Sequence, residues 1–158
     1  MAMRTCLIAV AAGGSLGLLL AAWGFEYLGG LAPCTMCYWQ RWPHIAAVVI
    51  GVLAAGTPLA ALAWAGAAAA ATSGGIGVYH TGVERDWWDG PAACTASGSA
   101  PADLTGGDLL SMEGAPALVL CDEVVWSLFG LSMASWNALA SFALALVWIV
   151  AATRYHRT

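Results

Sequence analysis

The chain has 158 residues, of which 61% are hydrophobic and only 9% are charged, and its mean hydropathy is +0.77. Soluble domains carry about 25% charged residues, so this composition excludes an ordinary soluble domain and indicates one small integral membrane domain. The formal net charge is -4 and lysine is absent, so no basic patch large enough to bind nucleic acid exists.

The first apolar run extends from about residue 6 to residue 25, which is close to the ~20 residues that a helix needs to cross a bilayer. It is longer than the apolar core of a signal peptide, so we predict a retained helix that ends near Glu26 and the Gly29-Gly30 pair. We expect Glu26 to lie at the membrane interface or to cap a neighbouring helix rather than to carry protons. Cys6, at the start of the run, is expected to be a small buried apolar side chain.

The next uncharged stretch, from His44 to Tyr79, is too long for a single spanning helix. Proline starts helices well and interrupts them badly, so Gly56-Thr57-Pro58 is the natural break. The sequence therefore predicts helices at about 38–55 and 58–79, joined by a tight turn. The later helix is rich in alanine and glycine, and we expect it to pack closely inside a bundle.

A fourth apolar run covers about residues 132–152. Its polar residues are most simply hydrogen-bond formers between helices, namely Ser132, Ser135, Asn137 and Ser141. Four spans place both termini on one side, and the arginines near the termini (Arg4, Arg154 and Arg157) indicate the cytoplasm. The predicted fold is an all-α membrane protein, a single-domain bundle of four transmembrane helices with a long outer, periplasmic loop at about 81–131.

The predicted outer loop contains Arg85 and eight of the nine acidic residues. Residues 95–107 are rich in Ser, Gly, Ala and Thr and are expected to be mobile. Residues 108–112 fit either a short helix on the membrane surface or a turn-rich loop, and residues 119–131 are expected to rest against the bilayer. Aromatic residues that flank the apolar runs on this side are expected to be interfacial anchors: Tyr38, Trp39, Trp42, Trp87, Trp88, Trp126 and Trp136.

Four of the five cysteines fall in the predicted outer segments, as expected in an oxidising compartment. Cys34 and Cys37 form a C-x-x-C pair, whereas Cys94 and Cys121 lie apart. Haem attachment requires histidine directly after the second cysteine, where Tyr38 stands. A zinc site would lack both a second C-x-x-C and a histidine inside the loop, so we expect two disulfides and no metal. The disulfides fit either redox chemistry or structural stapling.

Arg41 follows Cys37 by four residues, which is about one turn if a helix begins there. A cation and a helix N-terminus both stabilise a thiolate. Arg41 is therefore expected either to stabilise the Cys37 thiolate or to anchor the helix by reaching a lipid phosphate.

Three motifs together resemble the DsbB family of membrane thiol:quinone oxidoreductases. They are P-C-x-x-C-Y-W-Q-R-W-P from Pro33, Y-H-x-G-V-E from Tyr79 followed by W-W-x-G-P-x-x-C, and C-D-E-V-x-W-x-x-x-G-L-S-M-A-x-W-N from Cys121. The resemblance covers about residues 31–139. It implies a bacterial inner-membrane enzyme that reoxidises a periplasmic thioredoxin-fold (DsbA-like) protein and reduces ubiquinone or menaquinone.

The resemblance also implies a role for individual residues. Cys94 matches the cysteine that forms a mixed disulfide with the soluble partner, and Cys121 matches its companion, which then attacks Cys34. Cys37 is left as the thiolate that faces the quinone. Arg41 matches an arginine next to the quinone, and His80 matches, less securely, a histidine near the same pocket.

Two other functions remain open from the sequence. One is a non-catalytic membrane scaffold whose disulfides only staple its outer loop. The other is a quinone reductase of the vitamin K epoxide reductase type, also a four-helix C-x-x-C enzyme. The active C-x-x-C of that type resembles one placed late in the bundle, whereas here it follows the first helix, which argues against this reading.

Overall fold

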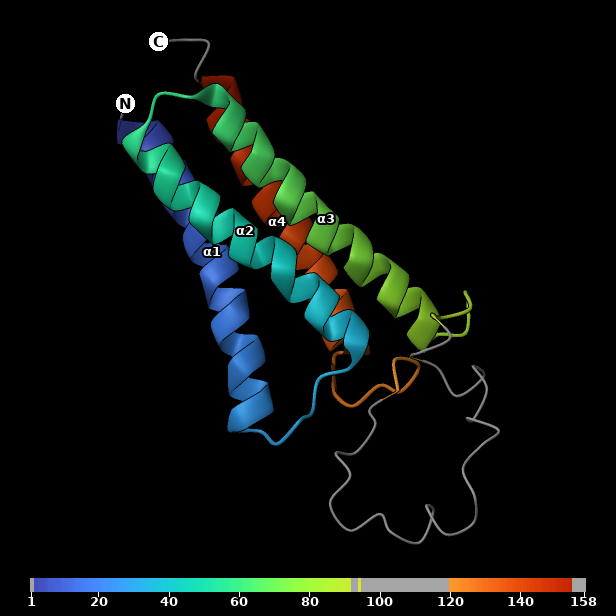
Figure 1. Ribbon diagram of the computed structural model, residues 1–158. Helices are drawn as coiled ribbons and strands as arrows, with labels where there is room; N and C mark the ends of the chain where they lie inside the picture. The colour runs from blue at the N-terminus through green and yellow to red at the C-terminus, as the bar shows by residue number, and fades with distance from the viewer. Residues whose placement is uncertain (1, 92–93, 95–119, 155–158) are drawn as a thin grey trace, which may run out of the picture.

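The computed structural model describes residues 2–91, 94 and 120–154. Our expectations for residues 95–107 and 108–112 lie outside the described residues. Within the described part the chain forms four helices and one short β-hairpin (Figure 1). The first helix begins and the last helix ends at the same end of the bundle (Figure 1).

The helices are α1 (Ala2–Tyr27), α2 (Thr35–Gly56), α3 (Ala60–Glu84) and α4 (Met133–Thr153). Three of them, α1, α3 and α4, are long and apolar enough to cross a membrane. The first turns of α2 carry Gln40, Arg41 and His44, which lower its hydropathy. The described helices therefore fit a membrane bundle, and a fourth crossing by α2 remains a prediction.

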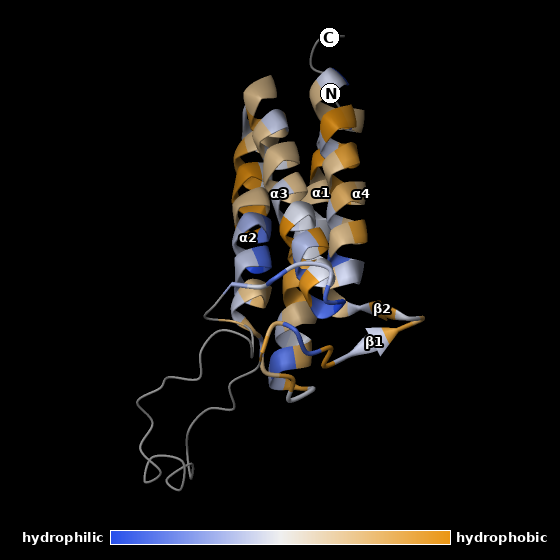
Figure 2. Cartoon of the chain, turned by 90° about the vertical axis from the view of Figure 1, so that its right-hand side faces the viewer, coloured by the Kyte–Doolittle hydropathy of each residue, from blue (hydrophilic) through white to orange (hydrophobic). Residues whose placement is uncertain are grey.

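Each helix packs against the next one in the chain, and α4 returns to α1. Hydrophilic residues gather toward the end opposite the termini, where α1 joins α2 and α3 leads toward the hairpin (Figure 2). This end holds every cysteine except Cys6. The bundle thus carries its polar chemistry at one end.

Small residues let α3 approach α4 closely. Gly66 faces the buried ring of Trp148, and a Cβ at Gly66 would lie 2.6 Å from that ring. A Cβ at Gly77 would lie 3.0 Å from the backbone oxygen of Ala134. These contacts confirm the expected close packing of the alanine- and glycine-rich helix.

The polar residues of α4 form the interhelical hydrogen bonds expected of them. Ser135 Oγ lies 3.0 Å from Thr81 Oγ1, and Ser132 Oγ donates to the Glu84 carboxylate. Asn137 Nδ2 donates to Gln40 Oε1 at 2.7 Å, and Ser141 Oγ lies 3.1 Å from His44 Nε2, so both residues bond to side chains of α2. These bonds join α4 to both α2 and α3 inside the bundle.

Some boundaries differ from the expected ones. Helix α2 begins at Thr35 instead of about residue 38, and α3 begins at Ala60 and continues to Glu84, past the predicted end near Tyr79. Charged residues mark the edge of the membrane, but the α3 backbone stays helical to Glu84, and Asp86 beyond the cap has a positive φ of 56°. His80 therefore projects from a helix rather than from a loop.

Cys6 is exposed on α1, so the prediction that it is buried was wrong. At this position α1 presents an outward face, and a small apolar side chain suits lipid as well as a protein core.

A hairpin that the sequence did not predict precedes α4. Strand β1 (Ser127–Leu128) pairs antiparallel with β2 (Leu131–Ser132) through a turn at Phe129-Gly130, where both φ angles are positive. Arg85 Nη2 donates to the Gly130 carbonyl at 3.3 Å. The hairpin thereby connects the end of α3 with the start of α4 beside the cysteine-rich end.

Candidate functional site

The C-x-x-C pair forms the N-terminus of α2. Cys34 is the N-cap residue, and its Sγ accepts a hydrogen bond from the Cys37 backbone N–H at 3.2 Å. The Sγ atoms of Cys34 and Cys37 are unbonded and lie 2.9 Å apart. Both sulfurs therefore sit where unpaired helix N–H groups favour negative charge.

The second cysteine pair packs against the first. Cys94 and Cys121 form a disulfide whose Cα atoms are 5.3 Å apart, a usual separation. Cys34, Cys94 and Cys121 are at most 4% exposed and share one buried cluster, against which Cys37 packs. Segments far apart in the sequence thus bring all four predicted cysteines together.

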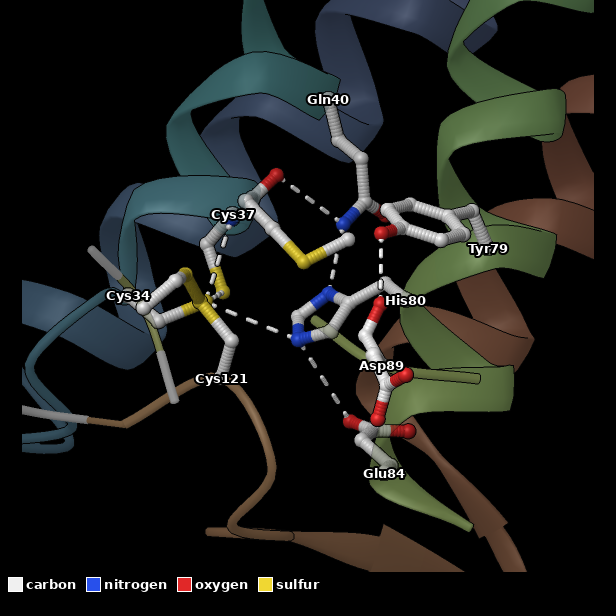
Figure 3. The surroundings of a disulfide bond; sticks show 10 residues. Cys34, Cys37, Gln40, Tyr79, His80, Glu84, Asp89 and Cys121 are labelled. Atoms are coloured by element: carbon white, nitrogen blue, oxygen red, sulfur yellow. Dashed lines mark hydrogen bonds and ion pairs between the residues drawn. A yellow bond between two sulfur atoms is a disulfide. The ribbon is translucent and has the colours of Figure 1, made fainter. Parts of the chain in front are cut away.

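His80, on α3, lies between the dithiol and two polar side chains (Figure 3). Its Nε2 is 3.6 Å from Cys34 Sγ and 3.9 Å from Glu84 Oε1, while its Nδ1 is 2.8 Å from Gln40 Nε2. The His80 side chain is buried. The structure thus places His80 beside Cys34.

Of the two thiols in the C-x-x-C pair, Cys34 has the lower pKa. A hydrogen bond from the Cys37 side chain lowers the pKa of the Cys34 thiol from 9.0 to about 4, although burial opposes the change. The hydrogen bond from His80 adds to the lowering of this pKa. In the reduced pair, Cys34 is therefore a thiolate at neutral pH.

Arg41 has a partner that the sequence did not suggest. Its Nη1 lies 2.5 Å from Glu26 Oε2 at the end of α1, and its guanidinium lies over the Tyr38 ring, 5.0 Å from the ring centroid. The ion pair connects α1 to α2, but Glu26 does not cap α2, whose N-cap residue is Cys34. Both side chains are largely buried.

A cavity of about 350 Å³ lies beside the dithiol. Its walls come mainly from α1, α2 and α4 and are mostly apolar, including Leu18, Phe25 and Trp126. Polar side chains reach it at a few points: Cys34, Cys37, Gln40, Arg41, His44, His80, Glu84, Glu123 and Asn137. An apolar cavity of this size with a few polar groups is typical of a small-molecule site.

The sequence did not identify Gln40, His44, Glu84 or Asn137 as site residues. A usable signal existed for two of them, because Cys37, Gln40, Arg41 and His44 recur at helical spacing and so share one face of α2. Glu84 and Asn137 come from α3 and α4, and their place at the site follows only from the packing of the bundle.

Cys34 Sγ, Cys37 Sγ and a ring nitrogen of His80 lie within 4.8 Å of one another, a grouping that a metal ion can use. Two thiolates on one tetrahedral zinc, each about 2.3 Å from the ion, stand roughly 3.8 Å apart. The observed sulfur separation of 2.9 Å is shorter. The spacing therefore suits exchange between a dithiol and a disulfide better than it suits zinc.

The chain matches the family described as Disulfide bond formation protein DsbB over residues 4–151. Among curated relatives, Disulfide bond formation protein B of Dechloromonas aromatica is 33% identical over 132 residues, which cover 80% of this chain and 78% of the relative. Disulfide bond formation protein B 2 of Pseudomonas aeruginosa is 30% identical over 158 residues, covering 94% of this chain and 89% of the relative. No solved structure gives a significant match.

Proposed function

The chain belongs to the DsbB family of disulfide bond formation proteins, and from that membership we propose that it is a membrane protein dithiol:quinone oxidoreductase. In this proposal it reoxidises a DsbA-like periplasmic thioredoxin-fold protein and passes the electrons to ubiquinone or menaquinone. The enzyme lies in the bacterial inner membrane with both termini in the cytoplasm and the redox cysteines on the periplasmic side.

The observation that carries this proposal is the packing of both cysteine pairs in one buried cluster. Thiol–disulfide exchange requires direct contact between an attacking thiolate and a disulfide sulfur. Cys121 and Cys34 belong to the same cluster, so exchange between the two pairs needs little movement. A scaffold that uses its disulfides only as staples has no need to bring the pairs together.

The first exchanges move the partner's electrons inward. A partner thiolate attacks the sulfur of Cys94, the Cys94–Cys121 bond breaks, and Cys121 leaves as a thiolate. Cys121 then attacks Cys34 in the oxidised Cys34–Cys37 pair, and Cys37 leaves as a thiolate at the cavity. Because Cys94 is only 3% exposed, it must move out of the cluster to meet the partner.

The next exchanges release the partner. Its second thiolate attacks the partner sulfur bonded to Cys94, so the oxidised partner departs and Cys94 becomes a thiolate. Cys94 then attacks Cys121, which restores the outer disulfide and frees Cys34. A thiol of low pKa leaves faster, so the pKa of about 4 at Cys34 favours this step. The partner's two electrons now reside in the Cys34/Cys37 dithiol.

The cavity fits a quinone. Its apolar wall suits a flat ring, Cys37 and Arg41 border it on α2, and His80 borders it on α3. A quinone bound there would take two electrons from the pair as the Cys34–Cys37 disulfide closes, with one proton from Cys37 and one from water. Arg41 lines the same cavity as Cys37, and its ion pair with Glu26 holds it there.

A trapping experiment tests the partner half of the proposal. A thioredoxin-fold partner whose second active-site cysteine is replaced by serine should form a stable mixed disulfide with Cys94. The Cys94→Ser variant should form none, and the Cys6→Ser variant should behave as wild type. Failure to trap at Cys94, or trapping at Cys34 instead, would contradict the proposed order.

A further inference from the structure

A buried hydrogen-bond network lies behind Cys34 and joins α2, α3 and α4. It includes Gln40 on α2, Ser73 and His80 on α3, and Asn137 on α4. Ser73, His80 and Gln40 are at most 6% exposed. Two backbone carbonyls, those of Met36 and Gln40, belong to this network. A carbonyl oxygen can only accept a hydrogen bond, so the side-chain atom that faces each carbonyl must be a donor.

The first carbonyl orients the Gln40 amide. Gln40 Nε2 donates to the Met36 carbonyl at 3.2 Å, and Gln40 Oε1 accepts from Asn137 Nδ2 at 2.7 Å. Turning the amide over would place Oε1 against the carbonyl oxygen, where neither atom carries a hydrogen. Nε2 must therefore point toward Met36.

The second carbonyl confirms this orientation independently. The Ser73 hydroxyl donates its one hydrogen to the Gln40 backbone carbonyl at 2.9 Å. Asn137 Nδ2 donates to Ser73 Oγ at 3.2 Å. If the Asn137 amide were turned over, Oδ1 would face Ser73 Oγ, whose hydrogen is already donated to the Gln40 carbonyl. Asn137 must therefore offer Nδ2 to both Ser73 and Gln40.

These constraints fix the hydrogens of His80. The second N–H of Gln40 Nε2 meets His80 Nδ1 at 2.8 Å, so Nδ1 must accept and cannot carry a hydrogen. We propose that Gln40 is a positioning residue that keeps His80 neutral, with its single ring hydrogen on Nε2, so that His80 donates to Cys34 Sγ rather than acting as a base. Figure 3 shows the imidazole between Gln40 and Cys34.

The charged groups around the imidazole also influence whether His80 stays neutral. Glu84 Oε1, 3.9 Å from His80 Nε2, favours a second proton on the ring. The Cys34 thiolate, 3.6 Å from the same nitrogen, favours a second proton on the ring as well. The other titratable groups near the dithiol are Cys37 and Arg41 on α2, Glu26 on α1 and Glu123 ahead of the hairpin. Arg41 pairs with Glu26, and Ser132, the N-cap residue of α4, donates to Glu84, which reduces the pull of that carboxylate on the ring proton. Gln40 opposes protonation directly by placing a donor at Nδ1.

The catalytic consequence rests on the proposed function, whereas the protonation state of His80 does not. When Cys94 restores the outer disulfide, Cys34 departs as a thiolate and needs a hydrogen-bond donor at that moment. A neutral His80 with Nε2–H supplies this donor without giving up its proton. Of the two protons that reach the quinone, one then comes from the Cys37 thiol and the other from water, which receives a proton when the partner's thiols ionise, and neither comes from His80.

Nitrogen-15 NMR of the full chain labelled at histidine tests the proposal directly, with His80→Gln used to assign the signal. In wild type the His80 signals should remain those of a neutral ring with hydrogen on Nε2 from about pH 6 to pH 8. In Gln40→Glu the new carboxylate accepts from Nδ1–H, so both nitrogens should carry hydrogen over the same range. Glu123→Gln, which also changes a charge at the cavity, should resemble wild type.

Hydrogen on both nitrogens, or on Nδ1 alone, in wild type at neutral pH would overturn the proposal. If Gln40→Glu does not fold, Gln40→Leu serves instead, since loss of the donor should let His80 become protonated at a higher pH than in wild type. An unchanged His80 signal in the folded variant would show that Gln40 does not set its state. Absence of quinone reduction by wild type would overturn the proposed function and leave the NMR result standing.

Discussion

At the scale of single residues, the reduced dithiol is asymmetric. Cys34 accepts hydrogen bonds from Cys37 and His80, whereas Arg41, the cation expected beside Cys37, is engaged by Glu26. A stabilised thiolate is the better leaving group, so the asymmetry favours the proposed step in which Cys34 leaves as Cys94 attacks Cys121.

The pH dependence of Cys34 follows from its lowered pKa. The folded protein holds this pKa at about 4 instead of 9.0, so the thiolate stabilises the reduced fold above pH 9, and this contribution disappears as the pH falls through 4. Alkylation of Cys34 in the reduced protein, followed by peptide mass spectrometry, should stay nearly constant from pH 9 to pH 6 and fall to half near pH 4. A midpoint near pH 9 would mean that the thiol is ordinary.

Arg41 provides a second prediction at this scale. Arg41→Ala removes the cation from the cavity, so the KM for quinone should rise on the order of tenfold while the KM for the soluble partner stays unchanged. Arg85→Ala, which removes an arginine bonded to the hairpin, serves as the matched control. Equal KM values for quinone in Arg41→Ala and wild type would remove Arg41 from the quinone site.

Sequence reasoning predicted the four cysteines, Arg41 and His80 as site residues, and the structure places them around one cluster and cavity. Spacing and motif resemblance select residue types along the chain. It did not reveal the Arg41–Glu26 pair or the Gln40–His80–Cys34 contacts. Each of these contacts joins different helices, and their formation depends on helix rotation and packing. A single sequence without a structure does not specify that geometry.

At the scale of secondary-structure elements, the chemistry depends on where α2 begins. Cys34 caps the helix and Cys37 lies in its first turn, so the helix N-terminus itself supports the dithiol. On α3, the continuation to Glu84 brings His80 to the same site. The apolar runs predicted the helices, but they did not predict these ends or the hairpin, since hydropathy reports burial in lipid rather than the local backbone path.

The close approach of α3 to α4 gives a prediction about stability. In Gly66→Ala the added methyl group would lie 2.6 Å from the Trp148 ring, so the helices must separate and the free energy of unfolding should fall by about 1–3 kcal/mol. Gly75→Ala, in the same helix, meets nothing within 4 Å and should be neutral or slightly stabilising. Unfolding of both variants in detergent measures the difference, and equal stabilities would show that α3 and α4 are not tightly packed at Gly66.

At the scale of the whole molecule, the bundle places the Cys94–Cys121 disulfide, the Cys34/Cys37 dithiol and an apolar cavity next to one another. The proposed electron path requires this arrangement. The composition of the sequence predicted the membrane setting, and the four-helix architecture agrees with the described part. The sequence did not predict the cavity. Its wall combines residues of α1, α2, α4 and the segment before the hairpin, which only the packing of the bundle brings together.

The most direct test of the central claim is the absorbance of quinone in bilayers that contain the purified protein, after addition of a reduced DsbA-like partner. We predict that one quinone is reduced for each partner dithiol oxidised, that Cys6→Ser behaves as wild type, and that Cys37→Ser reduces none. Oxidation of the partner without loss of the quinone signal, or normal turnover by Cys37→Ser, would contradict a path that ends at Cys37. No reaction in any variant, with ubiquinone and menaquinone both supplied, would favour a disulfide-stapled scaffold.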